Sequence, residues 1–252
     1  HQQFVAAAAA LETATASYAS SLAVADRTAA QQAFSAAMLV WQRVELMQLG
    51  PAGSLSAVAG GQDLRDQIYS WPTVNRCRID QETVEAAYKD PVAFAGEHIN
   101  VRGLDTLEYL LFNQSSDNAC PPQNVINSGG GWGLVSDLAQ RRADYAATVA
   151  TILSQHATSL NDAWSGAGDF RAQLLDAGKG SATYATAQQA LNAVSDGMFY
   201  IDSETKDVKL AVPVGLSGCD TVTCPAALES LYAKLSKQQI RGNIEGLKLL
   251  YS

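Results

Sequence analysis

Apolar residues recur at helical spacing along most of this chain, and almost no segment alternates apolar with polar residues. The first segment carries a stripe made of Phe4, Ala8, Leu11, Thr15, Tyr18 and Leu22. Steps of three and four residues lie on one face of an α-helix, whereas a strand would need a period of two. The pattern therefore predicts an all-α fold, most simply two antiparallel helical bundles packed together.

Turn-forming residues divide the chain into the expected helices. The helices are expected at about 3–25, 26–49, 62–69, 81–88, 101–112, 133–161 and 182–201, with two more from Pro225 and from Ser236. Residues 75–80 are expected to form a loop and residues 202–224 a long non-helical segment. The last helix should turn Ile240, Ile244, Leu247 and Tyr251 inward. A Ser-, Asn-, Pro- and Gly-rich stretch after Phe112 favours two domains, 1–125 and 126–252.

The stretch VRGLDTLEYLLF, residues 101–112, places two acids in an otherwise apolar run. Asp105 and Glu108 are three residues apart and share one side of a helix, while Leu, Tyr and Phe cover the rest of its circumference. A helix that is apolar all round is buried, and a buried carboxylate needs a cation, hydrogen-bond donors, a metal or a proton. The pair predicts a charge-compensating site.

A third acid, Glu45, falls on the expected inward stripe of the second helix. That stripe consists of Phe34, Met38, Trp41, Glu45 and Gln48. Because apolar stripes are wide, an alternative stripe centred on Val44 and Leu49 would leave Glu45 at its edge.

Four cysteines, Cys77, Cys120, Cys219 and Cys224, form an even set without a CxxC pair. The simplest pairing is Cys77–Cys120 with Cys219–Cys224, which implies an oxidising compartment and an exported bacterial protein. The chain starts with His rather than Met, so we expect that a signal peptide, a lipid-anchor segment or a tag preceded it. We therefore predict a periplasmic or outer-membrane-anchored location.

Net charge and hydropathy restrict the partners. The formal charge is −8, and no Lys/Arg cluster is present to bind nucleic acid or anionic lipid. No apolar run reaches the roughly 20 residues that a membrane-spanning helix requires.

The block FAGEHINVRGLDTLEYLLF, residues 94–112, resembles the signature of the imelysin-like family, in which Gly-x-His-x-x-Glu precedes aromatic and leucine residues. Four further segments are similar to family segments in the same order: residues 34–51, IYSWP with the following RID, KLAVPVGLSG, and residues 234–252. The resemblance implies two helical bundles and an envelope protein, in a family first described as metallopeptidases that includes iron-regulated proteins. Gly103 and Glu108 match the motif, but Asp105 stands where the family has His. This branch is similar to the family's predicted periplasmic lipoproteins.

One hypothesis for the acids is a metal site formed by Glu45, Asp105, Glu108 and His98. Carboxylate-rich sites suit iron or calcium better than zinc. A working peptidase is the alternative, but the chain lacks HExxH and any His pair at helical spacing.

A second hypothesis is purely structural, with Arg43, Arg76 and Arg102 pairing with the motif acids. A third treats the chain as a ligand-binding module, in which loop aromatics line a cleft; these are Tyr69, Trp71, Trp132 and Trp164. Taken together, the sequence features predict an exported binding protein of the cell envelope. It would be associated with binding or uptake of iron or another metal, perform no peptidase chemistry, and have envelope iron-uptake components as its expected partners.

Overall fold

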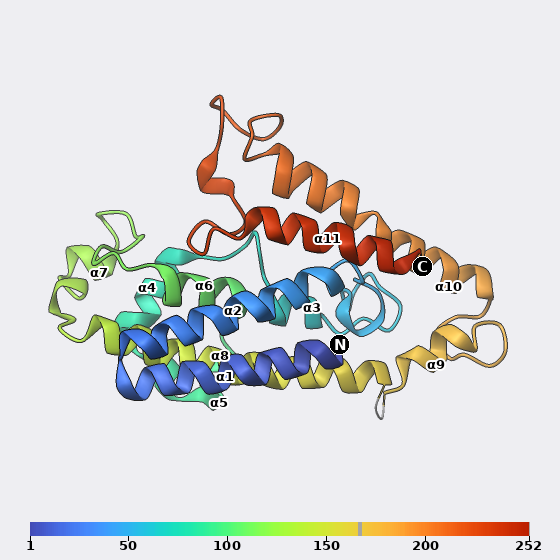
Figure 1. Ribbon diagram of the computed structural model, residues 1–252, viewed down its shortest axis with the longest axis horizontal. Coiled ribbons are helices and arrows are strands. Elements are labelled where there is room, and N and C mark those ends of the chain that lie inside the picture. The colour runs from blue at the N-terminus through green and yellow to red at the C-terminus, as the bar shows by residue number, and fades with distance from the viewer. Residues whose placement is uncertain (166–167, 252) are drawn as a thin grey trace. The chain divides into compact units, whose positions relative to one another are not determined.

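The computed structural model describes residues 1–165 and 168–251, and within them every regular element is a helix (Figure 1). The prediction of an all-α fold is confirmed. The α-helices are α1 Gln2–Ser21, α2 Val24–Val44, α3 Leu64–Ile68, α4 Arg76–Glu85, α5 Pro91–Phe94, α6 Leu104–Phe112, α7 Val125–Ser128, α8 Leu138–Ser165, α9 Phe170–Leu175, α10 Ala187–Met198 and α11 Ser236–Leu250. Among the described helices, none combines the length and apolar character needed to cross a membrane.

Shorter helical elements join these helices. They comprise the 3-10 helices η1 Gly50–Ala52, η2 Ala87–Lys89, η3 Ile99–Val101, η4 Trp132–Leu134 and η6 Pro225–Ala227, together with the π-helix η5, Ile201–Ala211. Figure 1 draws α10 and η5 as consecutive parts of one rod, and α11 packs against η5.

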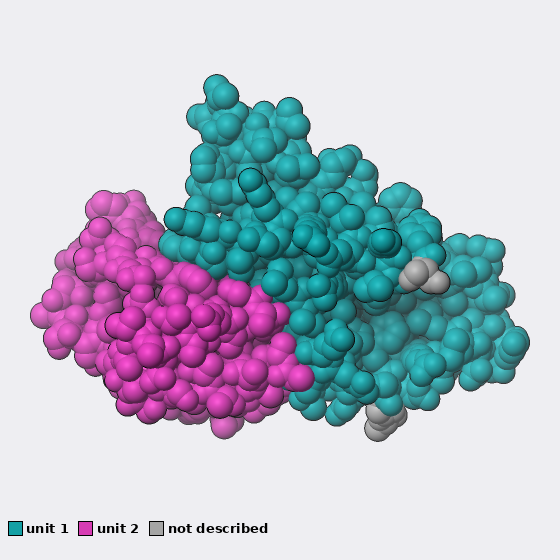
Figure 2. Space-filling view, viewed as in Figure 1, with its two compact units in different colours: residues 1–5, 38–66, 156–252 teal, residues 6–37, 67–155 magenta. Residues whose placement is uncertain are grey.

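The chain forms two compact units (Figure 2). Unit 1 comprises residues 1–5, 38–66 and 156–252, and unit 2 comprises residues 6–37 and 67–155. The units are interleaved in sequence, whereas the sequence suggested a single boundary near residue 125. The physical reason is that α1, α2 and α8 are long helices that each contribute residues to both units.

Unit 2 has its aromatic core around Tyr145 of α8. The Tyr145 ring stacks on Tyr88 with centroids 4.9 Å apart and meets Phe94 edge-on at 5.3 Å. Its hydroxyl donates a hydrogen bond to the carbonyl oxygen of Val101, three residues before the motif helix α6 begins. This contact helps to fix where α6 begins.

Unit 1 has a separate apolar cluster that joins the segment after α2 to α9 and α10. It consists of Leu49, Phe170, Ala177, Tyr184 and Ala190. Gly50 has a φ of +53°, and a Cβ there would lie 2.2 Å from the Phe170 ring. A side chain at position 50 would therefore displace the aromatic centre of this cluster.

Both predicted disulfides are present, Cys77–Cys120 in unit 2 and Cys219–Cys224 in unit 1. The prediction of a loop over residues 75–80 is wrong, because α4 already starts at Arg76. Asn75 caps it by accepting a hydrogen bond from the Arg78 backbone N–H. Cys77 therefore lies in the first turn of a helix.

Two predictions for the C-terminal third are also wrong. Residues 201–211 are helical, but their π-helical winding matches neither the α-helical nor the strand template. The helix expected from Pro225 is only the short turn η6. Glu229 and Ser230, which follow this turn, are buried polar residues. An amphipathic helix that continued here would bury apolar residues instead.

The last helix, α11, is present, but its buried face is not the predicted one. Ile244 is 56% exposed and Tyr251 is 74% exposed, so the prediction that they point inward is wrong, while Ile240 and Leu247 are half-buried. The inward face is small and polar and consists of Gln239, Gly242, Asn243 and Gly246. These residues have the i, i+3, i+4, i+7 spacing of a buried helix face, but they are polar residues and glycines rather than apolar residues.

Candidate functional site

The motif helix α6 is buried on all sides, as the sequence predicts. Every residue from Leu104 to Leu111 is buried, and the two acids retain only 6% exposure at Asp105 and 4% at Glu108. Gly103 precedes the helix with a φ of +93°, and a Cβ there would lie 2.8 Å from the carbonyl oxygen of Ile68. The motif glycine is thus required by both backbone angle and space.

Asp105 is held by hydrogen bonds within unit 2. Its Oδ2 accepts a 2.7 Å hydrogen bond from the Ser70 hydroxyl, and its Oδ1 accepts one from the Thr106 backbone N–H at 3.0 Å. The Ser70 carbonyl oxygen in turn accepts two hydrogen bonds from Thr73, which fixes the turn that presents Ser70. Asp105 also lies in the first turn of α6, where the helix dipole favours a negative charge.

Substituting Gly103 by alanine is expected to lower the free energy of unfolding by about 1–3 kcal/mol, the usual cost of a side chain in a glycine-only backbone region. Urea unfolding measures this change. Gly133→Ala is the matched control in the same unit, because Gly133 has no positive φ and a Cβ there meets nothing within 4 Å. Equal stability of the two variants would contradict the assigned role of Gly103.

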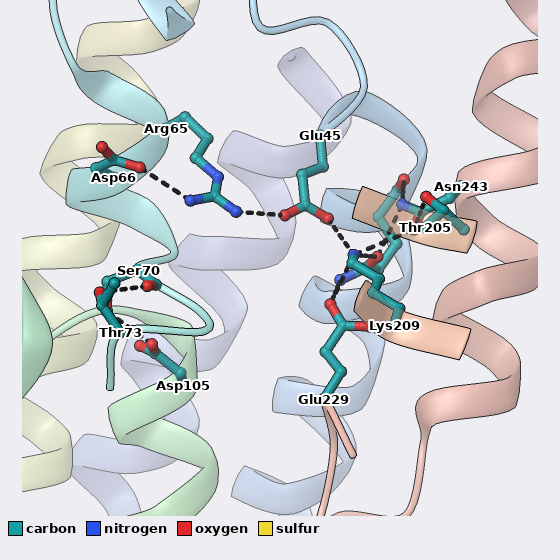
Figure 3. Close-up of polar contacts among 11 residues, drawn as sticks. Glu45, Arg65, Asp66, Ser70, Thr73, Asp105, Thr205, Lys209, Glu229 and Asn243 are labelled. Atoms are coloured by element: carbon teal, nitrogen blue, oxygen red, sulfur yellow. Dashed lines mark hydrogen bonds and ion pairs between the residues drawn. The ribbon is translucent and has the colours of Figure 1, made fainter. Parts of the chain in front are cut away.

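A fully buried lysine lies at the centre of a cluster of polar side chains in unit 1. Lys209 of η5 is 1% exposed, and its Nζ lies 2.7 Å from Glu45 Oε2 and 2.7 Å from Glu229 Oε1 (Figure 3). The ammonium also donates to Gln42 Oε1 at 2.9 Å and to Asn243 Oδ1 at 3.1 Å. Four acceptors from three segments of the chain therefore converge on one cation.

Amide side chains complete the hydrogen bonding of this cluster. Gln42 Nε2 donates to Glu229 at 2.9 Å, and Asn243 Nδ2 donates to both oxygens of Gln42 at 2.8 Å. Thr205 adds a hydroxyl hydrogen bond to Asn243. We call Gln42, Glu45, Arg65, Lys209, Glu229 and Asn243 the Lys209 network; its two acids and two bases balance in charge.

Glu45 is ionised because two cations face it. Burial raises the pKa of Glu45, but Lys209 and Arg65 outweigh it and hold the pKa below its ordinary value. Arg65 Nη2 lies 3.1 Å from Glu45 Oε1, so each carboxylate oxygen has its own cation. Figure 3 shows the row running from Asp66 through Arg65 and Glu45 to Lys209. The stripe that places Glu45 inward is therefore correct, since Glu45 is 1% exposed.

The four residues predicted as metal ligands are divided between the units. Glu45 belongs to unit 1, whereas His98, Asp105 and Glu108 belong to unit 2, with His98 exposed ahead of η3. Within residues 1–165 and 168–251, no three His, Cys, Asp or Glu side chains are grouped so that they could hold a metal ion. Glu45 does not fit a cation site, because a metal ion would face both Lys209 and Arg65 at short range.

The three arginines predicted as charge partners have different surroundings. Arg43 pairs with Glu245 of α11 at 3.0 Å on the surface. Arg102 donates to the Glu97 carbonyl oxygen at 2.9 Å, and burial lowers its pKa. Arg76 is half-buried in the first turn of α4. Two cations that the sequence reasoning missed, Arg65 and Lys209, bind the predicted acid Glu45.

Unit 2 contains a second pair of buried acids, Asp80 and Glu82 of α4, that was also missed. Asp80 Oδ2 accepts hydrogen bonds from Tyr109 of α6 at 2.8 Å and from the Ala119 N–H at 2.7 Å. Burial raises the pKa of Asp80 despite these donors, and burial likewise raises the pKa of Glu82, which is paired with Arg78. Asp80 thus links the motif helix to the loop that carries Cys120.

Lys209 and Asn243 were missed because both lie on elements with an unexpected inward face. A signal was present in the sequence: Gly242 and Gly246 are four residues apart, and only glycine fits either position. A Cβ would lie 2.9 Å from Gln42 Cβ at Gly242 and 2.2 Å from the Arg43 carbonyl oxygen at Gly246. Paired glycines at this spacing mark the face of a helix that lies against another backbone.

Comparison with known proteins gives one family and one solved structure. The family model described as Imelysin matches residues 1–252. A crystal structure from Parabacteroides distasonis, provisionally named an iron-regulated protein A precursor, superposes with a TM-score of 0.71 at 18% identity, covering 98% of this chain and 67% of that chain. No curated protein sequence matches. The match over the full length shows that the chain belongs to the imelysin family.

Proposed function

We propose that this chain is a binding protein of the cell envelope with a role in iron or metal handling, and that it does not hydrolyse peptides. The observation that carries the proposal is Asp105, which stands at the motif's histidine position and is buried with both carboxylate oxygens hydrogen-bonded. A carboxylate in this setting is a hard oxygen ligand, whereas zinc peptidases rely on imidazole ligands.

Two further observations support the cellular role. The two disulfides favour an oxidising compartment, which is consistent with export. The solved structure that shares this fold carries a name that refers to iron regulation.

For the metal itself, Asp105 and Glu108 are the proposed oxygen ligands, because Glu45 is already neutralised by Lys209 and Arg65. His98 is not part of this proposal, because it is exposed and is not grouped with the two acids in the described structure. Hard cations such as ferric iron and calcium match this donor set better than zinc does.

Glu108→Gln is expected to reduce the affinity for ferric iron or calcium by about tenfold or more, since it removes a charged ligand. Elemental analysis of the purified protein and calorimetric titration with iron, calcium and zinc measure this effect. Asp117→Asn, which removes an exposed charge in the same unit, should leave the affinity unchanged. Absence of metal uptake by the wild type, or equal uptake by wild type and Glu108→Gln, would refute the metal role.

The proposed lack of peptidase activity has its own test. Incubation with a denatured protein substrate, with and without added zinc, should give no cleavage above the blank for the wild type. Cleavage by the wild type that disappears in Glu108→Gln would instead show that the protein is a peptidase.

A further inference from the structure

Unit 1 contains a cavity of about 620 Å³ that lies outside the motif region. Its walls are residues 48–49 and 57–59, Thr183 and Tyr184, one side of α10, and the start of η5. The volume falls in the range of sites for small organic ligands. Gly197 of α10 allows this wall to approach the segment after α2, because a Cβ there would lie 3.3 Å from the Leu46 carbonyl oxygen.

Two buried phenol groups line this cavity. Tyr184 is 3% exposed and Tyr200 is 6% exposed. The hydroxyl oxygen of Tyr184 lacks a hydrogen-bond partner in the described structure, whereas the Tyr200 hydroxyl faces the Glu45 carboxylate. Burial of a hydroxyl without a partner is unfavourable, so such groups mark places where a ligand atom completes the bonding.

Both phenols are hydrogen-bond donors at neutral pH. Burial raises the pKa of Tyr184. Burial raises the pKa of Tyr200 as well, and the facing Glu45 carboxylate raises it further. A ligand that satisfies the Tyr184 donor must supply an acceptor oxygen, such as a hydroxyl or a carbonyl.

The charge of the lining excludes anions. Asp196 and Glu204 line the cavity, and its described lining contains no Lys, Arg or His. Lys209 lies behind the wall, with its Nζ 5.4 Å from the centroid of the Tyr200 ring. Its charge is already neutralised by Glu45 and Glu229 at 2.7 Å, so it does not offset the two acids of the lining.

Aromatic rings beside carboxylates suit an organic cation. Phe199, Tyr184 and Tyr200 line the cavity, and the face of an aromatic ring attracts a cation, while Asp196 and Glu204 supply countercharge. We propose that this cavity binds a small organic amine that carries a hydroxyl or carbonyl oxygen, with the Tyr184 hydroxyl donating to that oxygen and the two acids facing the ammonium group.

Calorimetric titration with probes of similar size and different charge tests the proposal. Glucosamine and choline supply the amine, while glucose and glucuronate are the neutral and anionic counterparts. We expect at least one amine to bind, with an affinity about tenfold or more above those of glucose and glucuronate. The proposal is overturned if neither amine binds, or if glucuronate binds as tightly as glucosamine.

Tyr184→Phe separates recognition from folding. Removing an unpartnered hydroxyl should leave the melting temperature of the free protein unchanged or higher, while the affinity for the amine that binds falls about tenfold. Tyr88→Phe is the matched control, since Tyr88 in unit 2 is also buried with an unpartnered hydroxyl and does not line the cavity. Equal affinity of Tyr184→Phe and Tyr88→Phe would refute the assigned contact.

The double variant Asp196→Asn/Glu204→Gln tests separately whether the two carboxylates select for an amine. This double variant should lose the preference for an amine over glucose, and a retained preference would contradict the proposal. The site is independent of the proposed metal ligands, because Asp105 and Glu108 belong to unit 2. Failure of metal binding in Glu108→Gln therefore leaves amine binding unchanged, and the two proposals can fail separately.

Discussion

Replacing Lys209 by methionine is expected to lower the free energy of unfolding by about 3–5 kcal/mol, the usual cost of removing one partner from a buried ion pair. The large effect follows from what remains behind. Glu45 is 1% exposed and Glu229 is 4% exposed, and both bond to the same ammonium group at 2.7 Å. Without Lys209, the two carboxylates keep only Arg65 as a close cation in the network. Urea unfolding at neutral pH measures the loss.

Lys206→Met is the matched control for this experiment. Lys206 lies three residues earlier on the same π-helix and pairs with Asp202 and Asp207 at the surface, so its loss should not change stability measurably. Equal losses in the two variants would show that η5 tolerates no substitution and that Lys209 has no special role.

Acid titration distinguishes the ion network from simple packing. In the wild type the pKa of Glu45 is lowered below 4.5, so its stabilising contribution is complete above that value and is lost as the pH falls through the lower, folded-state pKa. In Lys209→Met, protonation of a carboxylate removes an uncompensated charge instead. The stability deficit of the variant should therefore shrink as the pH is lowered towards 4.5 and below. A deficit that stays constant would point to lost packing.

Removing the Cys77–Cys120 disulfide by double substitution with serine is expected to cost about 4 kcal/mol, because the bond closes a long loop in the unfolded chain. The two cysteines are 43 residues apart, and the bond joins the first turn of α4 to the loop that also binds Asp80. Thermal and urea unfolding of the double variant measure the loss.

The Cys219–Cys224 disulfide provides the comparison. Its cysteines are only 5 residues apart, so the same loop-entropy argument gives about 2 kcal/mol for its removal. If its loss proves as costly as the loss of Cys77–Cys120, the long loop is already restricted in the unfolded state and the entropy argument fails.

The buried acids illustrate how much of the candidate site was accessible from sequence. Burial of Asp105 and Glu108 followed from the apolar run around them, whereas helical spacing left two possible stripes for Glu45; all three are nearly inaccessible. Their partners were harder to predict, because a partner such as Ser70 or Arg65 comes from a distant segment or from a short helix with no marked periodicity. Helical spacing says which side chains need compensation, but not which residue supplies it.

The C-terminal third shows where pattern reading fails for a physical reason. An apolar stripe predicts the inward face only where the neighbouring element is apolar, and α11 packs against η5, which carries Thr205 and Lys209 as its buried residues. Its inward face is accordingly polar and glycine-containing. The outward Ile244 and Tyr251 then give a false signal, since single exposed apolar residues are common on protein surfaces.

The Lys209 network depends on the π-helical winding of η5. Tyr200 and Lys209 are nine residues apart, which is two and a half turns in an α-helix and would place them on opposite sides. With its i to i+5 bonding, a π-helix completes about two turns over the same distance, so the lysine lies over the tyrosine ring. A substitution within η5 that restored α-helical winding at the same chain length would turn Lys209 away from Glu45 and Glu229 without changing its chemistry. The π-helical winding between residues 201 and 208 is thus as strict a requirement as the identity of the lysine, and a related sequence that keeps the lysine but not this winding should not be assumed to keep the network.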